Sequence, residues 1–553
     1  MAELSKTQKV FTMLGALLGL LLAALDQTIV ATAGPRIQKD LHIAPALYVW
    51  ITTSYLVAST VLVPIYGKLS DLYGRRRILM AGIIIFLAGS AACGISQSAT
   101  QLIAFRAVQG LGSAALFTSA FAVVADLFPP AERGKWQGMF GAAFGLSSVV
   151  GPLLGGFITD NFGWNWVFYV NVPIGAVAIA FILTYMPPLR PDLAHRPRLD
   201  IAGALALAVA ALPLLLALSL GHAEGLGTTG WPWLSWQILA LFATSLLGAI
   251  AFVAIEARAQ SPIIDLRLFR IKTVAIGSAA TFVIGGSFLG AIVFLPLFMV
   301  NVVGVSATAA GLTTTPLTFG IVAANITAGQ AVSRVGKYKG ILLFSLVVQC
   351  AAFVILGLTL SPASTRAHVS IEMVLLGIGL GPSIPLFTLA IQTAVPVQEI
   401  GIATAAATFF RQMGGTIGIA IVGTIFATSF AASLQRDMPP DARAQMAQHA
   451  GGGSATGEGE GDPRVAFDVQ AIQARADRDI DASPMPPDAK AAAKARAHEN
   501  IEHVGRVFKV AFTDALVRAF WVSLAIALLG LVLTAFLPAL PLRAGPKPVA
   551  IAE

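Results

Sequence analysis

Long runs of apolar residues recur along most of the chain, separated by polar or basic segments. Each run is close to the ~20 residues that a helix needs to cross the hydrocarbon core of a bilayer. None shows the alternation of apolar and polar residues that is typical of a membrane β-barrel. The pattern therefore predicts an all-α integral membrane protein with fourteen spans. They cover residues 10–31, 46–66, 78–96, 101–125, 136–158, 164–186, 199–220, 234–255, 273–300, 308–330, 340–360, 371–392, 401–430 and 511–537.

Prolines and charged residues interrupt this pattern after the sixth span, at residues 187–197, and a second polar linker covers residues 256–272. The breaks predict three parts, with six helices in residues 1–190, two inserted helices in 191–260 and six more in 261–553. A long polar segment at residues 431–510 separates the last two spans and contains a low-complexity stretch. We expect this segment on the outer side of the membrane, with short amphipathic helices in it.

The basic residues favour one orientation of the spans. The chain carries 36 lysines and arginines against 28 acidic residues, and the basic ones gather in alternate loops. Because basic loops stay in the cytoplasm, we expect both termini there, with the protein in the inner membrane. The spread over many loops also argues against a nucleic-acid partner. The first span carries Asp26 and lacks a small-residue cleavage site, so we interpret it as a retained helix.

Asp26 and Arg106 lie deep inside predicted spans, and Asp26 is the only carboxylate that does. The first span runs outward and the fourth inward, so each residue lies about five residues, or ~7.5 Å, below the outer boundary. A charge inside the bilayer is costly without a partner, which makes the two residues a candidate pair. Two interpretations stay open at this point. The pair is either a proton switch, in which the guanidinium alters the proton affinity of Asp26, or a fixed structural ion pair.

The polar loop at residues 67–78, GKLSDLYGRRRI, joins the second and third spans. An ordinary basic loop would satisfy the topology with lysines and arginines alone. This loop also carries an acid and two glycines. Its pattern, G-x-L-x-D-x-x-G-R-[RK]-[RK], resembles the corresponding loop of the major facilitator superfamily of secondary transporters.

That resemblance implies a charge relay between Asp71, Arg75 and Asp126, which locks a cytoplasmic gate against the thirteenth span. The residues predicted for the gate are Gly67, Asp71, Gly74, Arg75, Arg76, Asp126 and Arg411. For Arg411, an alternative stays open in which the side chain snorkels to the membrane interface.

Small residues recur every three or four positions along the fifth span, GMFGAAFGLSSVVGPLLGG. Such a stripe lets another helix approach closely, and a generic packing face would account for its spacing. The ending G-P-x-x-G-G, however, also resembles the antiporter motif of facilitator exporters, with Ser147 at a position where that motif usually has glycine. The residues assigned to the motif are Gly138, Gly151, Pro152, Gly155 and Gly156.

Three further strings resemble the fourteen-span drug:proton antiporter family: LDQTIVATAGP around Asp26, WNWVFYVNVPIG at residues 164–175 and FFRQMGGTIGIAIVG at residues 409–423. The resemblance covers nearly the whole chain. It implies the major facilitator fold, with two six-helix halves and two inserted helices. It also implies a proton-coupled antiporter that exports drugs or other small amphipathic or lipophilic compounds by alternating access. Participation of a periplasmic adaptor stays open.

The second half contains a weakened copy of the gate loop, GQAVSRVGKYKG at residues 329–340, in which Ser333 replaces the acid. This agrees with an internal repeat whose second copy has kept the topology but not the charge relay. Several other polar residues lie within or at the ends of spans, where each needs a partner. They are candidates either for a substrate cavity or for hydrogen bonds between helices: Asn301, Asn325, Gln349 and Gln392.

Sequence signatures of catalysis and of nucleotide binding are missing. The chain has no G-x-x-x-x-G-K-[ST] phosphate loop, no H-E-x-x-H and no histidine inside a predicted span, so we expect neither a cofactor nor a metal. Cys93 and Cys350 lie inside apolar runs, where we expect them to pack. Two alternatives to drug export stay open. One is a dedicated exporter of an endogenous metabolite, lipid or self-made antibiotic, and the other is a membrane-embedded enzyme or receptor.

Overall fold

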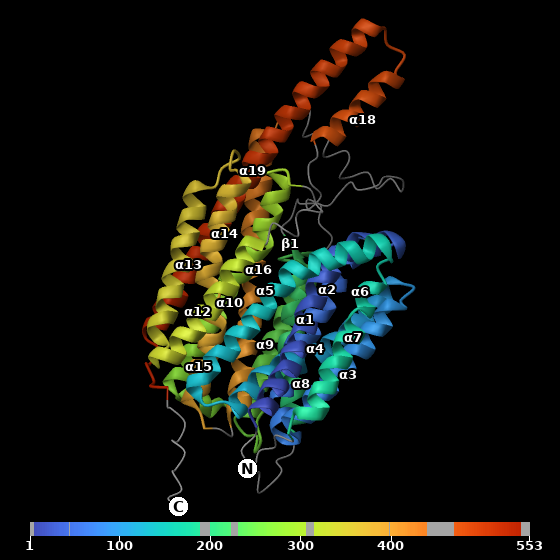
Figure 1. Cartoon of the computed structure of the whole chain (residues 1–553). Helices are drawn as coiled ribbons and strands as arrows, with labels where there is room; N and C mark the ends of the chain where they lie inside the picture. The colour runs from blue at the N-terminus through green and yellow to red at the C-terminus, as the bar shows by residue number, and fades with distance from the viewer. Residues whose placement is uncertain are drawn as a thin grey trace, which may run out of the picture.

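The computed structural model describes residues 5–43, 45–187, 199–222, 231–305, 315–396, 399–438 and 469–542. In this part of the chain, long helices lie side by side in a bundle, and α1 begins at the same end of the bundle at which α19 ends (Figure 1). Most of the polar linker expected at residues 187–197, and the low-complexity stretch near residues 451–463, lie outside the described residues.

The first half of the bundle is built from α1 to α7. Their bounds are α1 (Lys6–Asp40), α2 (Pro45–Tyr73), α3 (Arg75–Gly94), α4 (Ala99–Leu127), α5 (Pro130–Asn161), α6 (Trp166–Tyr169) and α7 (Asn171–Tyr185). Helix α4 packs against both α2 and α3, and α1 packs against both α5 and α7. An apolar core that includes Leu20, Phe86 and Phe140 fills the space between them.

The second half follows the short 3-10 helix η1 (Leu266–Arg270). Its helices are α10 (Lys272–Asn301), α12 (Thr315–Val335), α13 (Lys339–Thr359), α14 (Arg366–Leu380), α15 (Ser383–Ala394), α16 (Ile400–Asp437) and α19 (Pro487–Ala535). Helices α10, α16 and α19 pack against one another. Phe298, Phe353 and Phe520 belong to the core of this half, which is separate from the first core.

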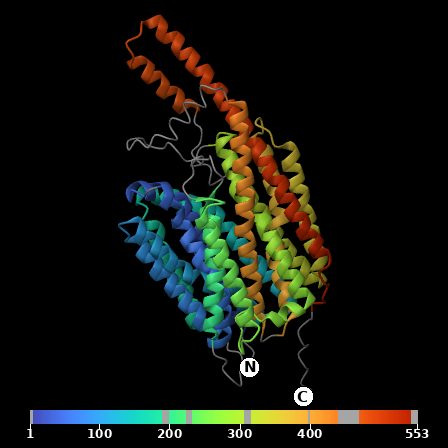
Figure 2. The same cartoon turned by 180° about the vertical axis from the view of Figure 1, so that it is seen from behind.

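Two helices, α8 (Ile201–Leu220) and α9 (Trp236–Glu256), form the insert between the halves. A pair of short parallel strands, β1 (Gly221–His222) and β2 (Trp231–Pro232), lies between them in the chain. Helix α8 contacts α2 of the first half and α16 of the second, and Figure 2 shows the green insert between the blue and the orange helices. Leu207 and Phe252 of the insert share an apolar cluster with Val61 of α2 and Phe409 of α16. The insert therefore covers a seam between the halves.

Twelve segments of the described residues are long and apolar enough to cross a membrane. Two of them combine neighbouring helices, α6 with α7 and α14 with α15. Two predicted spans are not among the twelve: α10, of 30 residues, covers one, and α12, of 21 residues, covers the other from Thr315 on, with residues 308–314 outside the described part of the chain. The all-α membrane architecture expected from the sequence is confirmed, with twelve candidate spans rather than a direct count of fourteen.

Several helices run beyond the spans that hydropathy predicts. The first predicted span ends at Ala31 whereas α1 continues to Asp40, and the last predicted span begins at Ala511 whereas α19 begins at Pro487. Hydropathy marks only the apolar length of a helix, because polar residues continue it outside the bilayer. The first part of α19 pairs with α18 (Val469–Ala482), through the ammonium of Lys494 and the Asp481 carboxylate at 2.8 Å, for example. This hairpin projects beyond the bundle, at the end opposite to the start of α1 (Figure 1).

Candidate functional site

Asp26 and Arg106 meet inside the first half of the bundle. Nη1 of Arg106 lies 2.5 Å from Oδ2 of Asp26, and the two residues are 1% and 0% exposed. Asp26 lies on α1 and Arg106 on α4, at the common depth that the sequence predicts. A buried charge that loses its partner is strongly destabilising, so each residue depends on the other.

Polar groups from three further positions complete the surroundings of this pair. Nε2 of Gln109 donates to Oδ1 of Asp26 at 2.8 Å, and Oε1 of Gln109 accepts from Nη1 of Arg106 at 2.7 Å. Nδ2 of Asn171, on α7, donates to Asp26 Oδ1 at 3.1 Å. On the other side, Arg106 Nε donates to the backbone carbonyl of Ile51 at 3.1 Å, and its guanidinium carbon lies 4.3 Å from the centre of the Tyr55 ring. The carboxylate of Asp26 is thus held by donors from two helices besides its own.

Gln109 and Asn171 are site residues that the sequence interpretation missed. Gln109 follows Arg106 by three positions on α4, so helical spacing places both on one face. That spacing was a usable signal. Asn171 lies in the string WNWVFYVNVPIG, which carries a family resemblance, but nothing local connects it with Asp26.

Asp26 is not the only carboxylate that lies well inside a membrane-length segment, contrary to the sequence prediction. Glu372 on α14 is 3% exposed and accepts from the hydroxyl of Thr359, and Nε2 of His368 lies 3.3 Å from its Oε1. The predicted span begins at residue 371, which placed Glu372 at a boundary and left His368 outside. Because α14 begins at Arg366, both residues belong to the membrane-length segment that α14 forms with α15.

A second charged group lies at the end of the bundle where α1 begins. Arg75 binds two acids: its Nη1 lies 2.5 Å from Oδ1 of Asp71, and its Nε lies 2.9 Å from Oδ2 of Asp126. Gly74 has a φ of 92°, which permits the sharp turn between α2 and α3 that directs Arg75 inward. Arg76 donates to the backbone carbonyl of Leu183 at 2.7 Å, within the same half. The structure therefore brings together the three charges of the predicted relay.

Glycines bring this charged group against the second half of the bundle. A Cβ atom at Gly401 of α16 would meet Oδ1 of Asp71 and would lie 2.7 Å from Nη1 of Arg75. A Cβ atom at Gly67 of α2 would meet the Cβ of Ala405. The two glycines therefore leave no room for a larger side chain where α2 and α16 cross.

Arg411 does not belong to this charged group, contrary to one of its two predicted roles. It lies ten residues after Gly401 on α16, which is about 15 Å along the helix axis. Among the described residues it forms no ion pair with an acid. Its backbone carbonyl instead faces Gly285 of α10.

Gln392 joins the two halves of the bundle and does not lie with the other residues predicted for a substrate cavity. Nε2 of Gln137, on α5, donates to Oε1 of Gln392, on α15, at 3.0 Å. Nε2 of Gln392 donates to Oγ1 of Thr404 at 3.0 Å and to the backbone carbonyl of Phe121 at 3.3 Å. Both glutamines are buried. This amide bridge adds a contact between the halves close to the charged group of Arg75.

The remaining predicted cavity residues are buried but lie apart. Asn301 donates to the backbone of its own helix, at Leu297, and Gln349 donates to the hydroxyl of Ser287 on α10 at 2.8 Å. Asn325 lies on α12, beside Gly141 of α5. The structure does not assemble these side chains into one site.

The glycine stripe of α5 faces two different partners. A Cβ atom at Gly138 would lie 2.7 Å from the backbone carbonyl of Asn325, on α12 of the other half. Further along, a Cβ atom at Gly151 would meet Thr28, and one at Gly155 would lie 2.8 Å from the carbonyl of Ile29, both on α1. Pro152 lies inside the helix between these last two glycines. Helix α5 therefore leaves α12 and joins α1 along its length.

Replacing Gly155 with alanine is expected to lower the melting temperature of the purified protein, with a destabilisation of about 1–3 kcal/mol from overpacking. The same replacement at the adjacent Gly156 should have little effect, because a Cβ atom there meets nothing within 4 Å. Thermal unfolding in detergent compares the two variants. Equal shifts for both would contradict the close approach of α1 to α5.

The described residues contain no group of three or more histidine, cysteine or acidic side chains that could hold a metal ion. Cys93 and Cys350 are both free and buried.

Comparison with known proteins gives one consistent result. A family model described as Major Facilitator Superfamily matches residues 16–419. Multidrug resistance protein 3 of Bacillus subtilis (strain 168) is 41% identical over 458 residues, which are 83% of this chain and 86% of that protein. Multidrug transporter protein MdtP of the same organism is 38% identical over 423 residues, 76% of each chain. The solved structure of the proton:xylose symporter XylE has the same fold, with a TM-score of 0.57, 14% identity and 96% of both chains covered.

Proposed function

The chain belongs to the major facilitator superfamily, and from this premise we propose that it is a proton-coupled exporter of drugs and other small amphipathic compounds. It is a multi-pass membrane transporter and not an enzyme. Relatives whose names describe multidrug resistance and multidrug transport support the substrate class. The single observation that carries the proton coupling is the buried pair of Asp26 and Arg106.

Asp26 is the group that binds and releases the proton in this proposal. With its carboxylate ionised, Oδ2 accepts from Arg106, and Oδ1 accepts from Gln109 and Asn171. Protonation removes the charge that attracts the guanidinium and converts one accepting oxygen into a donor. At least one of these three donors must then move. Because Arg106 and Asn171 lie on α4 and α7, a proton on Asp26 changes how α1 packs against both helices.

The proton gradient supplies the energy for export. Each charge that crosses the membrane contributes about 2.3 kcal/mol per 100 mV of membrane potential. Protonation of Asp26 from the outside accompanies release of the drug, and deprotonation toward the cytoplasm resets the carrier. The G-P-x-x-G-G ending at Gly156 supports exchange rather than cotransport, since it resembles the motif of exporters.

We further propose that α10 and α12 also cross the membrane, which gives fourteen spans with both termini in the cytoplasm. The functional divisions are then residues 1–190, the insert at 191–260 and residues 261–553. Under this orientation, the charged group of Arg75 and the amide bridge of Gln392 lie at the cytoplasmic end and form the inner gate. The hairpin of α18 and α19 lies outside the cell membrane.

The contacts between the halves support an outward-facing conformation. The closest contacts lie at one end: Gly67 is near the end of α2, Gly401 is at the start of α16, and the Gln137–Gln392 bridge joins the first turns of α5 to the last turn of α15. Farther from this end, α5 packs on α1 of its own half rather than on α12. The two halves are thus in contact at one end of the bundle and apart at the other. This arrangement is one of the two states that alternating access requires.

Drug-dependent proton movement tests the proposal. Purified protein is reconstituted into vesicles that hold a pH-sensitive dye, and a quaternary ammonium compound or a neutral lipophilic drug is added on the side of the gate. We expect protons to cross in the direction opposite to the drug, and a protonophore to abolish accumulation of the drug. Accumulation that persists with the protonophore would overturn the proton coupling. A response to one metabolite or lipid alone would instead identify a dedicated exporter.

A further inference from the structure

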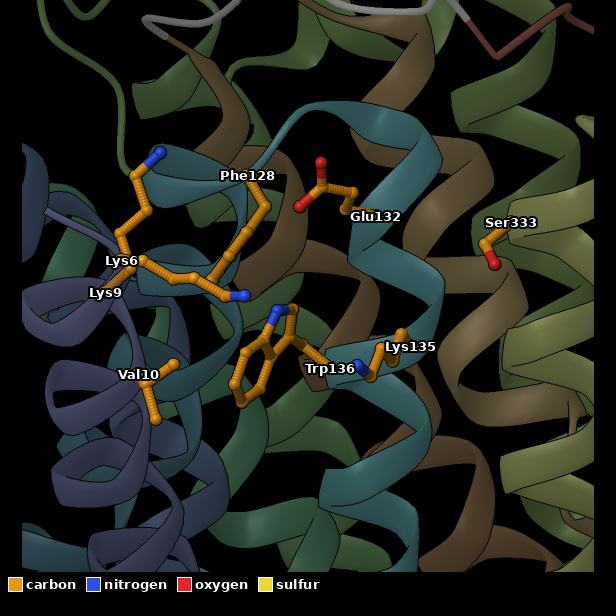
Figure 3. Close-up of a pocket in the computed structure, with 8 residues that line it drawn as sticks. All are labelled: Lys6, Lys9, Val10, Phe128, Glu132, Lys135, Trp136 and Ser333. Atoms are coloured by element: carbon orange, nitrogen blue, oxygen red, sulfur yellow. The ribbon is translucent and has the colours of Figure 1, made fainter. Parts of the chain in front are cut away.

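A cavity of about 570 Å³ lies at the end of the bundle where α1 begins, between the two halves (Figure 3). Figure 3 shows Lys6 and Lys9 on one side, from α1, and Lys135 across the cavity, from α5. Ser333, near the end of α12, contributes a hydroxyl from the other half. The volume lies within the range typical of small-ligand sites. None of these residues takes part in the gate or in the site of Asp26.

The charge on the lining favours an anion. Three of the lining residues are lysines, against the single carboxylate of Glu132. The neighbouring Arg133 is already engaged, because it donates to the backbone carbonyls of Phe128 and Ala125, both at 2.9 Å, and so holds the end of α4. In the described part of the chain, the three lysines of the lining outnumber its one carboxylate, Glu132, which leaves net positive charge for a ligand.

The cavity also has an aromatic side at the depth of the membrane surface. Phe128 and Trp136 line it, and their rings stack with centroids 5.0 Å apart. The membrane-length segments of α1 and α5 begin at Lys6 and Glu132, so the cavity lies where lipid headgroups meet water. Tryptophan is enriched at this depth because its ring is apolar and its N–H is polar. A ligand with a charged head beside an apolar part fits such a lining.

Ser333 gives an independent reason to expect a negatively charged ligand. It occupies the position at which the second copy of the gate loop has lost its acid, whereas the first copy keeps Asp71. An aspartate at this position would place a second carboxylate at the cavity and repel an anion. The exposed serine hydroxyl is neutral and donates to the backbone carbonyl of Gln330 at 3.0 Å, so it must rotate to donate its one proton to a ligand.

We propose that this cavity binds the phosphate group of an anionic lipid of the inner leaflet, and that the bound lipid favours the conformation closed at this end. Lys6, Lys9 and Lys135 bind the phosphate, and Ser333 contacts it from the second half. A ligand held by both halves is lost when they separate at this end, so its binding energy favours the closed state. The proposal rests on the cytoplasmic orientation proposed above, but its binding test needs no transport.

The test compares lipid retention by two variants with equal changes in charge. The first variant is K6Q/K9Q/K135Q. The matched control is R267Q/R270Q/K337Q, at exposed residues of the same proposed face that do not line the cavity. Each protein is placed in nanodiscs of phosphatidylcholine with phosphatidylglycerol, and retained lipid is counted by native mass spectrometry. A separate arm adds inorganic phosphate to discs of phosphatidylcholine alone.

We expect the lysine variant to retain phosphatidylglycerol about tenfold less than the wild type, since each basic residue near the surface contributes to binding of anionic lipid. The control should retain phosphatidylglycerol as the wild type does. The S333D variant keeps all three lysines but should still retain less of this lipid. Spin labels on α5 and α12 should report a wider cytoplasmic distance without phosphatidylglycerol. If both triple variants lose phosphatidylglycerol equally, the lipid is held by general attraction to a basic surface, and the proposed site is wrong. If inorganic phosphate alone, in discs of phosphatidylcholine, restores the shorter spin-label distance, free phosphate and not lipid is the ligand.

Discussion

Replacing Asp26 with asparagine is expected to abolish proton-driven accumulation of drug in vesicles. Asparagine preserves the shape of the side chain and can accept a hydrogen bond, but it does not ionise and so provides no negative charge for the guanidinium of Arg106. Arg106 is then a buried charge without its counter-ion, a loss that costs about 3–5 kcal/mol in comparable cases. We expect proton-driven transport to fall to the level of empty vesicles, with a lower melting temperature.

Two measurements separate a coupling role from a purely structural one. In the coupling proposal, the folded Asp26→Asn protein still exchanges labelled for unlabelled drug down a gradient, because that exchange needs no proton. A structural pair would lose exchange and accumulation together. Asp40→Asn is the matched control, since Asp40 lies on the same helix in an exposed pair with Arg36. That control should transport normally, and a comparable loss in it would contradict a specific role for Asp26.

Replacing Gly401 with valine is expected to hold the inner gate open and to lower transport about tenfold or more. The reason is overpacking where α2 and α16 cross, which destabilises the closed state by about 2 kcal/mol. A side chain there must displace the carboxylate of Asp71 and the guanidinium of Arg75. Neither group can withdraw freely, because Arg75 is also bound to Asp126. A cysteine placed at the buried Gln137 should become reactive to an impermeant reagent applied from the gate side.

Gly340→Val is the control for this second prediction. Gly340 lies at the start of α13, and a Cβ atom there meets nothing within 4 Å. The native cysteines, Cys93 and Cys350, are buried and should not obscure the label. If the cysteine at position 137 reacts with the impermeant reagent no faster in the Gly401→Val protein than with glycine at position 401, the crossing of α2 and α16 is not the gate.

The membrane helices could be predicted from the sequence because crossing a bilayer requires an uninterrupted apolar length, which is a local property. Their true ends could not. Helix α16 continues to Asp437 and α19 begins at Pro487, through residues that hydropathy does not separate from a loop. Breaks inside spans were also missed, as between α14 and α15, where Gly381 and Pro382 interrupt a continuous apolar run.

The predicted sites differ in how far local information determines them. Asp26 and Arg106 could be paired because burial inside a bilayer compels two isolated charges to meet. Gln392 could not be assigned to the contact between the halves, since its partner Gln137 is 255 residues away and a buried amide has many other ways to bond. Arg411 was misplaced because its neighbours depend on how α16 crosses α10, which no motif records.

The exchange of partners along α5 has a consequence for the energetics of transport. On the α5 side, the surface that faces α12 is a stripe of glycines, whose amide groups are already bonded within their own helix. Because these glycines have no side chains, parting the two helices at the stripe breaks few interactions between side chains. The two end states can therefore lie close in free energy, whereas shifting a balance from 1:99 to 99:1 takes about 5.5 kcal/mol of preferential binding. A contact to which α5 contributes mainly glycine therefore lets the binding energy of one proton or one drug molecule shift the balance between the two states.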